Sequence, residues 1–159
     1  MSVTILAVGR MKEKPYRMMA DEYMKRLSRY GKFEEIELPD LPEPANSSPA
    51  IERQIREKEG EAILSRIRPG SHVIALTIPG KQWDSPGLSR HLDELLTRGA
   101  SDITFVIGGS LGLSEQVIAR AEEEMSMSKM TFPHQLARVM LMEQLYRAMK
   151  IRAGERYHK

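Results

Sequence analysis

The sequence predicts a single α/β domain whose mostly parallel sheet is flanked by helices, and three observations lead to this fold class. Short continuous apolar runs, typical of strands buried on both faces, recur along the chain. Segments with helical periodicity separate them, and such alternation is typical of parallel sheets covered by helices. The chain has 159 residues, 41% hydrophobic and 29% charged, which fits one globular domain over residues 1–159.

The N-terminal half contains two expected strands and two expected helices. Gly9 ends the first apolar run, and the second strand is more polar, which predicts a place near the edge of the sheet. Pro15 opens the first helix, whose apolar stripe includes Met19. Four prolines among residues 39–49 predict a surface loop rather than a domain linker. The strands are expected over residues 3–8 and 33–38, and the helices over 15–30 and 50–67.

The C-terminal half repeats the alternation. Ser85 before Pro86 is typical of a helix cap followed by proline in the first turn, and Ser114 is expected to cap the next helix. His134 is expected to form a hydrogen bond at the start of the last helix, which Pro133 opens. His72 and His91 are expected at the surface, and strands are expected over residues 73–78, 103–107 and 125–130, the first ending at a Pro79-Gly80-Lys81 turn.

The last expected helix is apolar around nearly its whole circumference, so it has to be buried on every side. Either it threads the core of one chain or its second face meets another subunit. The second alternative is favoured and predicts a homodimer. Glu143 and Arg147 stand four residues apart on this helix and can form an ion pair, for which simple helix support is a sufficient explanation.

Composition excludes several classes of function. The chain has no cysteine, so disulfides, thiolate metal sites and cysteine nucleophiles are excluded. No cluster of metal-ligating residues stands out, and no metal is expected. The apolar run at the N-terminus is too short and wrongly placed for a signal peptide, and no segment has the length of a membrane span. The expected compartment is the cytoplasm.

Charge is distributed unevenly. The net charge of +2 is too small to indicate nucleic-acid binding by itself. Residues 138–159 carry six Lys or Arg against two Glu, and a second basic cluster joins Arg10, Lys12, Lys14 and Arg17. Two solvated faces are the favoured interpretation on charge alone; two edges of a phosphate-binding surface are the alternative.

The stretch ITFVIGGSLGL, residues 103–113, places glycines directly after an expected strand. In parallel sheets ligands bind at the carboxyl ends of strands. The Rossmann pattern fails because Ser110 occupies its second glycine position, and Gly80-Lys81 lacks the Ser or Thr of a P-loop. On local sequence alone, ligand binding and a simple tight turn remain equally good explanations.

Three segments together carry a resemblance: FVIGGSLGLS, then SMSKMTFPHQLARVMLMEQLYRAMKI, then the ending GERYHK. In order and spacing they resemble the RlmH family, SPOUT-class methyltransferases that methylate N3 of a pseudouridine in bacterial 23S ribosomal RNA. The resemblance runs from the LAVGR start through IPGKQWDSPGL to the terminal YHK. Two positions depart from the family pattern: Thr77 replaces an acidic residue common in relatives, and Arg156 replaces a smaller residue or proline.

The resemblance implies a SPOUT-type fold with a C-terminal trefoil knot, a homodimer, and S-adenosyl-L-methionine as cofactor. Three loops gathered at the knot would hold the cofactor, because adenine favours apolar side chains and close backbone amides. Matched position by position, the expected cofactor-binding residues are Leu76, Ile78, Gly80, Gly108, Gly109, Met127, Ser128, Lys129, Met130, Thr131 and Phe132.

The implied reaction requires N3 of the pseudouridine to lose its imino proton. Donors or cations near its carbonyls would favour the anion, and the candidates are Arg138, Tyr157 and His158. His158 suits a base or a donor, although a disordered terminal residue is its alternative explanation. The expected substrate is 23S rRNA within the assembled ribosome. A non-catalytic ribosome-binding factor that retains the fold is the main alternative function, and a generic nucleotide-binding enzyme is a weaker one.

Overall fold

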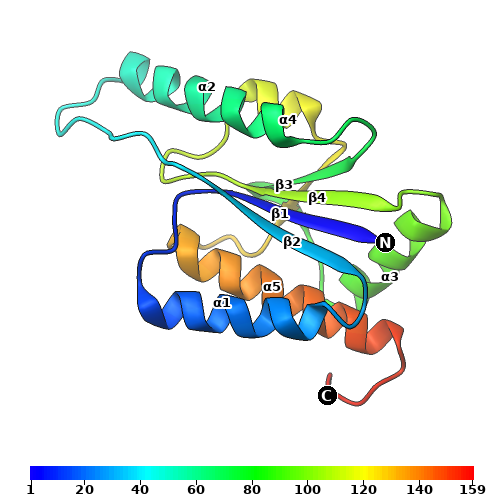
Figure 1. Cartoon of the computed structure of the whole chain (residues 1–159). Coiled ribbons are helices and arrows are strands. Elements are labelled where there is room, and N and C mark those ends of the chain that lie inside the picture. The colour runs from blue at the N-terminus through cyan, green and yellow to red at the C-terminus, as the bar shows by residue number, and fades with distance from the viewer.

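The computed structural model describes all residues, 1–159, as a three-layer sandwich (Figure 1). One layer holds α2 and α4, the middle layer is the sheet, and the other layer holds α1, α5 and α3. The elements in chain order are β1 (Ser2–Val8), α1 (Lys14–Leu27), β2 (Lys32–Leu38), α2 (Pro49–Arg66), β3 (His72–Gln82), α3 (Ser85–Thr97), β4 (Asp102–Ile107), α4 (Glu115–Arg120), β5 (Glu123–Ser126) and α5 (His134–Arg152). The predicted fold class is confirmed.

The five strands form one parallel sheet in the order β2-β1-β4-β3-β5. β2 lies at an edge, as its polar sequence predicts. Each step along the chain toward the β2 edge passes through α1 or α3, on one face, and each step toward the β5 edge passes through α2 or α4, on the other. All four crossovers therefore have the same hand, as expected for parallel strands. The trefoil knot that the resemblance implies stays a prediction.

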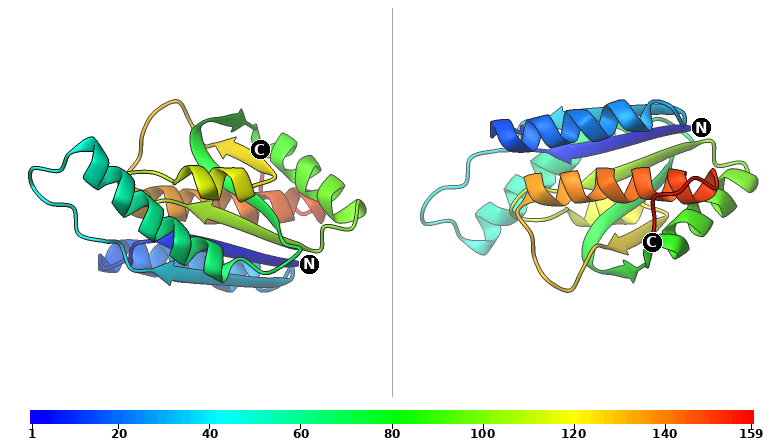
Figure 2. Two further views of the ribbon diagram at one scale, coloured as in Figure 1. Left: turned by 90° about the horizontal axis from the view of Figure 1, so that it is seen from above. Right: turned by 90° about the horizontal axis from the view of Figure 1, so that it is seen from below.

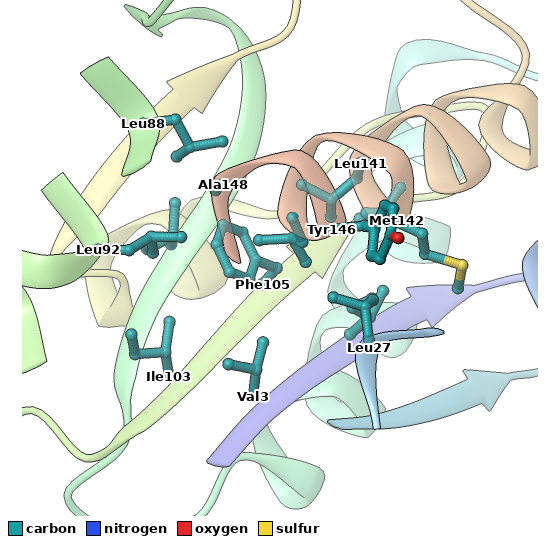
Figure 3. Close-up of a cluster of buried hydrophobic side chains, with 14 of the residues drawn as sticks. Val3, Leu27, Leu88, Leu92, Ile103, Phe105, Leu141, Met142, Tyr146 and Ala148 are labelled. Carbon is teal, nitrogen blue, oxygen red and sulfur yellow. The ribbon is translucent and has the colours of Figure 1, made fainter. Parts of the chain in front are cut away.

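Two apolar clusters fill the spaces between the layers. Along β1, Val3 and Ile5 face the α1–α5–α3 layer, whereas Leu6 and Val8 face the α2–α4 layer. This two-residue alternation explains why the strand sequence is apolar throughout. The larger cluster centres on the fully buried Phe105, surrounded by side chains of α1, α3 and α5 (Figure 3).

The structure corrects three local expectations. The first helix ends at Leu27 rather than near Tyr30, and Met19 is 41% exposed instead of lining the apolar stripe. Asp84, not Ser85, caps α3, because the Asp84 carboxylate accepts the Gly87 amide at 2.6 Å. The last short strand spans Glu123–Ser126, two to four residues earlier than expected.

Most of the apolar circumference of helix α5 is covered by other parts of the same chain. It packs between α1 and α3 and lies against the sheet, so neighbours of the same chain cover three sides (Figure 2). Of the two alternatives that the sequence leaves open, the helix within the core explains its burial without a second subunit. The homodimer stays a prediction that this helix alone does not require.

His72 and His91 are not free surface residues. Each Nε2 contacts a different oxygen of Glu123, at 2.5 Å and 2.7 Å. Trp83 stacks on the His91 ring with centroids 4.6 Å apart. These contacts fasten the edge strand β5 to β3 and α3. No group of three or more His, Cys, Asp or Glu side chains is arranged to hold a metal ion, and no helix has the length and apolar character that crossing a membrane requires.

Candidate functional site

A cavity of about 840 Å³ opens at the carboxyl edge of the sheet, beside a bulge in β3 and the ends of β4 and β5. Its lining is mostly apolar, with the loops after β4 and β5 and the first turns of α5 forming the remaining walls. Predicted cofactor-binding residues that line it are Leu76, Ile78, Gly108, Gly109, Met127, Ser128, Met130, Thr131 and Phe132. The three segments named from the sequence therefore meet around one space.

The first wall is a bulge in β3. Leu76 and Lys81 both stand opposite Met125 in the β3–β5 ladder, so residues 77–80 are displaced from it. The predicted turn at Pro79-Gly80 is this bulge, and the strand resumes after it. Gly80 does not line the cavity. A Cβ at this glycine would lie 2.7 Å from the backbone of Met125, so glycine is needed there to let the two strands approach.

The second wall is the glycine turn after β4. The Gly112 amide donates to the Gly109 carbonyl at 3.1 Å, and Gly112 has φ of +81°, a left-handed value that favours glycine. The glycines therefore close a tight turn, and this turn borders the cavity, while ligand binding by it stays a prediction.

The third wall leads from β5 into α5. Ile78 and Met130 are large apolar residues that remain 51% and 73% exposed at this site. Lys129, although predicted to bind the cofactor, is exposed and does not line the cavity. His134 lines the cavity, but it does not form the expected helix-start hydrogen bond: its Nδ1 is buried without a partner, and its ring lies close against Gly9.

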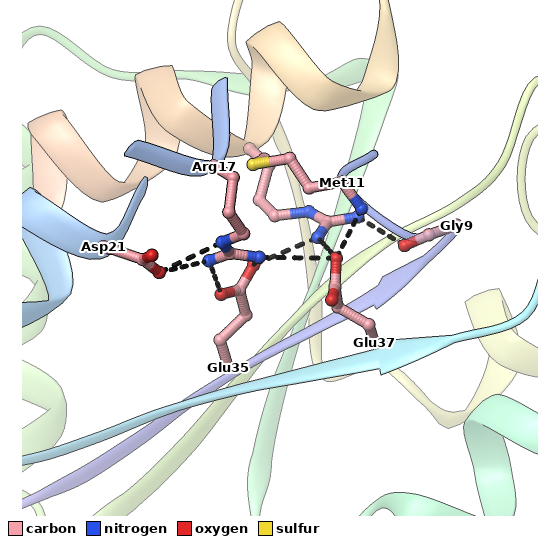
Figure 4. A network of polar contacts seen from close by, with 7 residues as sticks. Gly9, Met11, Arg17, Asp21, Glu35 and Glu37 are labelled. Atoms are coloured by element: carbon pink, nitrogen blue, oxygen red, sulfur yellow. Dashed lines mark hydrogen bonds and ion pairs between the residues drawn. The ribbon is translucent and has the colours of Figure 1, made fainter. Parts of the chain in front are cut away.

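Arg138 does not line the cavity. Its side chain is 0% exposed and lies in an ion cluster beneath the N-terminal half of α5 (Figure 4). One Nη donates to Glu35 at 3.0 Å and to Glu37 at 2.5 Å, and the other donates to the Gly9 carbonyl at 2.7 Å. Arg17 completes the cluster through ion pairs with Glu35 and Asp21. These contacts tie α5 to β1 and β2, and they do not support contact between Arg138 and a substrate.

One acidic member of this cluster, Glu37, has a lowered pKa. Burial by itself would raise the pKa of Glu37. The Met11 amide, which donates at 2.7 Å, and the Arg138 guanidinium outweigh burial and hold the pKa of Glu37 below its ordinary value. The carboxylate therefore stays charged at neutral pH and stabilises the buried guanidinium.

Tyr157 and His158 lie along the C-terminal half of α5. The Tyr157 hydroxyl donates to Glu143 at 3.1 Å, and the Arg147 guanidinium lies 4.7 Å from the centre of the Tyr157 ring. His158 Nδ1 is 3.4 Å from Arg147. The Glu143–Arg147 ion pair thus does more than support its helix, because it holds the C-terminal tail. Burial, followed by the bond to Glu143, raises the pKa of Tyr157.

The tail and the cavity are far apart within one chain. Ala137 borders the cavity, and Arg147 holds the tail ten residues later on the same helix. At 1.5 Å per residue this separation is about 15 Å. Figure 2 shows the C-terminus beside the C-terminal half of α5, whereas the loop that leads from β5 into α5 joins the other end of the helix. The structure therefore brings together the three segments predicted to bind the cofactor but leaves Arg138, Tyr157 and His158 outside the cavity.

Comparison with known proteins identifies the fold family. Residues 1–158 match the family model described as "Predicted SPOUT methyltransferase". The chain belongs to the SPOUT methyltransferase family. It is 54% identical, over all of both chains, to the ribosomal RNA large subunit methyltransferase H 1 of Clostridium perfringens strain SM101 and to the methyltransferase H of strain 13.

A solved structure supports the fold of this SPOUT methyltransferase. A probable methylase family protein from Haemophilus influenzae superposes with a TM-score of 0.55 and 12% identity, over 99% of this chain and 70% of the other. At that identity the likeness concerns the fold alone.

Sequence reasoning missed several cavity residues of the SPOUT methyltransferase. Ile118 comes from α4 and Glu124 from β5, neither of which belongs to the loops named from the sequence. Glu124 was missed in part because the strand was expected to begin at Met125, whereas β5 begins at Glu123. Ile118 offered no local signal, since only the packing of α4 places it at the cavity.

Proposed function

We propose that this SPOUT methyltransferase transfers a methyl group from S-adenosyl-L-methionine to N3 of a pseudouridine in the 23S rRNA of the large ribosomal subunit. We further propose that it acts in the cytoplasm, on the assembled ribosome, as a homodimer. The observation that carries the proposal is the cavity walled by the bulge in β3 and the ends of β4 and β5, in a chain 54% identical to proteins named large subunit rRNA methyltransferases.

The residues around the cavity fit the cofactor. A volume of about 840 Å³ lies within the range of small-molecule sites. Leu76, Ile78 and Met127 offer the apolar surface that a purine requires, and the glycine turn brings backbone close enough to contact its edge. The partial exposure of Ile78 is consistent with a side chain that a ligand covers.

When bound, the cofactor supplies a sulfonium methyl group that needs little activation. The protein then has to align the acceptor nitrogen with the methyl group and to favour loss of its proton. The rigid bulge of β3 and the closed glycine turn fix the walls that provide this alignment. Arg138 contributes indirectly, because its ion cluster fixes the start of α5, which borders the cavity.

Donors for the substrate are proposed to come from the tail, through Tyr157 and His158. Because the cavity and the tail lie about 15 Å apart along α5, a role in catalysis requires a second copy of the chain that brings its tail to this cavity. This requirement supports the homodimer more directly than the composition of α5 does. Met18, 62% exposed on α1, offers apolar surface for such an interface.

The proposed RNA contacts lie at the N-terminal basic cluster rather than along α5. Arg147, Lys150 and Arg152 each form an ion pair with a carboxylate of the same chain. Arg10 and Lys12, by contrast, are exposed and form no ion pair, and they follow Gly9, which touches the cavity residue His134. We propose that they contact phosphates near the modified nucleotide.

The tail role is tested by deleting residues 157–159. We expect the truncated protein to lose methylation of ribosomes while it retains cofactor binding in calorimetry, because the tail lies outside the cavity. Deletion of Lys159 alone is the matched control and is expected to preserve both. Normal methylation by the longer deletion would show that the tail has no catalytic role.

The rival function is a ribosome-binding factor without catalytic activity. It predicts no heat of binding with S-adenosyl-L-methionine and no change in 23S rRNA when the gene is removed. We expect instead that 23S rRNA from cells without the gene lacks one methylated pseudouridine, and that complementation restores it. Mass spectrometry of the 23S rRNA measures both.

A further inference from the structure

Glu124 is the one carboxylate that lines the cavity. Strand alternation explains its position: Glu123 points toward His72 and His91, and the next residue along β5 points to the other side. The Thr77 hydroxyl, in the bulge of β3, donates to Glu124 Oε1 at 3.0 Å. Two strand ends thus hold one acidic side chain in a fixed place on an otherwise mostly apolar wall.

No cation of the chain pairs with Glu124. Several other partly buried carboxylates have one: Arg138 and Arg17 reach Glu35, and Arg147 reaches Glu143. Glu59, which lies outside the cavity lining, is the buried exception and accepts only the Leu41 amide. The only hydrogen-bond partner of the Glu124 side chain is the neutral Thr77 hydroxyl, and no hydrogen bond joins it to His134, the other ionisable residue of the lining. The cavity therefore presents a negative charge without a counter-charge.

A ligand that fills the cavity removes water from this carboxylate. Covering an unpaired charge is costly, and a positive charge on the ligand offsets that cost, whereas a neutral ligand does not. S-adenosyl-L-methionine carries a net positive charge through its sulfonium, and S-adenosyl-homocysteine, the product left after methyl transfer, is neutral.

We propose that Glu124, held by Thr77, is a specificity-determining residue that makes the cavity prefer the cationic methyl donor to its neutral product. The inference rests on the proposed function, since it assumes that this cavity binds the cofactor. Loss of the sulfonium charge on methyl transfer weakens the attraction to Glu124, so the same carboxylate favours exchange of product for fresh donor.

Calorimetry with both ligands tests the proposal on the full-length protein. The wild type is expected to bind the donor more tightly than the product. Glu124→Gln is expected to weaken donor binding by about tenfold, a modest value for a charge-assisted contact, and to leave product binding within about twofold. Thr77→Val is expected to act in the same direction with a smaller effect, because the carboxylate stays but loses its fixed orientation.

Glu123→Gln is the matched control, because Glu123 is the preceding residue of the same strand and faces the two histidines; both affinities should stay unchanged. Equal weakening of donor and product by Glu124→Gln would overturn the proposal and indicate hydrogen bonds to hydroxyl groups that both ligands share. If Glu124→Gln left the affinities for both donor and product unchanged, that result would also overturn the proposal. If the wild type bound neither ligand, the proposed function would fall together with the inference, whereas either of the first two results would leave the proposed function standing.

Discussion

Replacing Arg138 by methionine removes the charged centre of a buried cluster and keeps most of its apolar stem. The substitution deprives the Gly9 carbonyl of a donor and leaves Glu35 and Glu37 without the guanidinium 3.0 Å and 2.5 Å away. Because these bonds join α5 to β2 and to Gly9, directly after β1, the loss is expected in the free energy of unfolding.

The expected loss of stability depends on the contacts that Glu35 and Glu37 keep after the substitution. Removing one partner of a buried ion pair costs about 3–5 kcal/mol. Arg17 still contacts both glutamates, and the Glu37 side chain is 28% exposed to water, so the low end, about 3 kcal/mol, applies here. For a domain of this size that loss lowers the midpoint of thermal unfolding by roughly 6–12 °C.

Urea unfolding at pH 7 and equal protein concentration measures the effect. Arg152→Met is the control, because Arg152 pairs with Asp93 at the exposed surface and such pairs contribute at most about 1 kcal/mol. A loss for Arg138→Met no larger than that of the control would refute the structural role. Because Arg138 lowers the pKa of Glu37, the difference from wild type should be full above pH 4.5 and should shrink as pH falls through the lowered pKa.

Two further predictions concern stability. Gly80→Ala places a Cβ 2.7 Å from the Met125 backbone, so we expect urea unfolding to show at least about 2 kcal/mol of lost stability. Gly70→Ala is the control, because its Cβ would enter open space, and we expect it to cost about 1 kcal/mol. Equal losses for the two variants would contradict the close approach of the strands at Gly80. Burial raises the pKa of Glu59, so its stabilising protonated form is lost as pH rises through that pKa. Glu59→Gln, which can still accept the Leu41 amide, should therefore be more stable than wild type at pH 7 and not below pH 4; a pH-independent difference would exclude this explanation.

The sequence located the segments that wall the cavity, but not all of the side chains that line it. Leu76 and Met127 were found by matching positions to the family resemblance, and Gly108 was also visible as a glycine that follows an apolar run. Glu124 was missed because its position depends on which face of β5 turns toward the cavity. The buried ion cluster of Arg138 could not be foreseen either, since its three acceptors come from residues about 100 or more positions earlier in the chain.

Local pattern determined the α/β class, the order of strands and helices along the chain, and the glycine turn, because apolar periodicity, caps and turn residues act over a few positions. Tertiary structure alone decided the strand order in the sheet, the bulge that Gly80 permits, and the burial of α5 between α1 and α3. It also decided that ITFVIGGSLGL forms one wall of a cavity whose only carboxylate comes from another strand. These features depend on contacts between segments distant in sequence, which the residues of any one segment cannot encode.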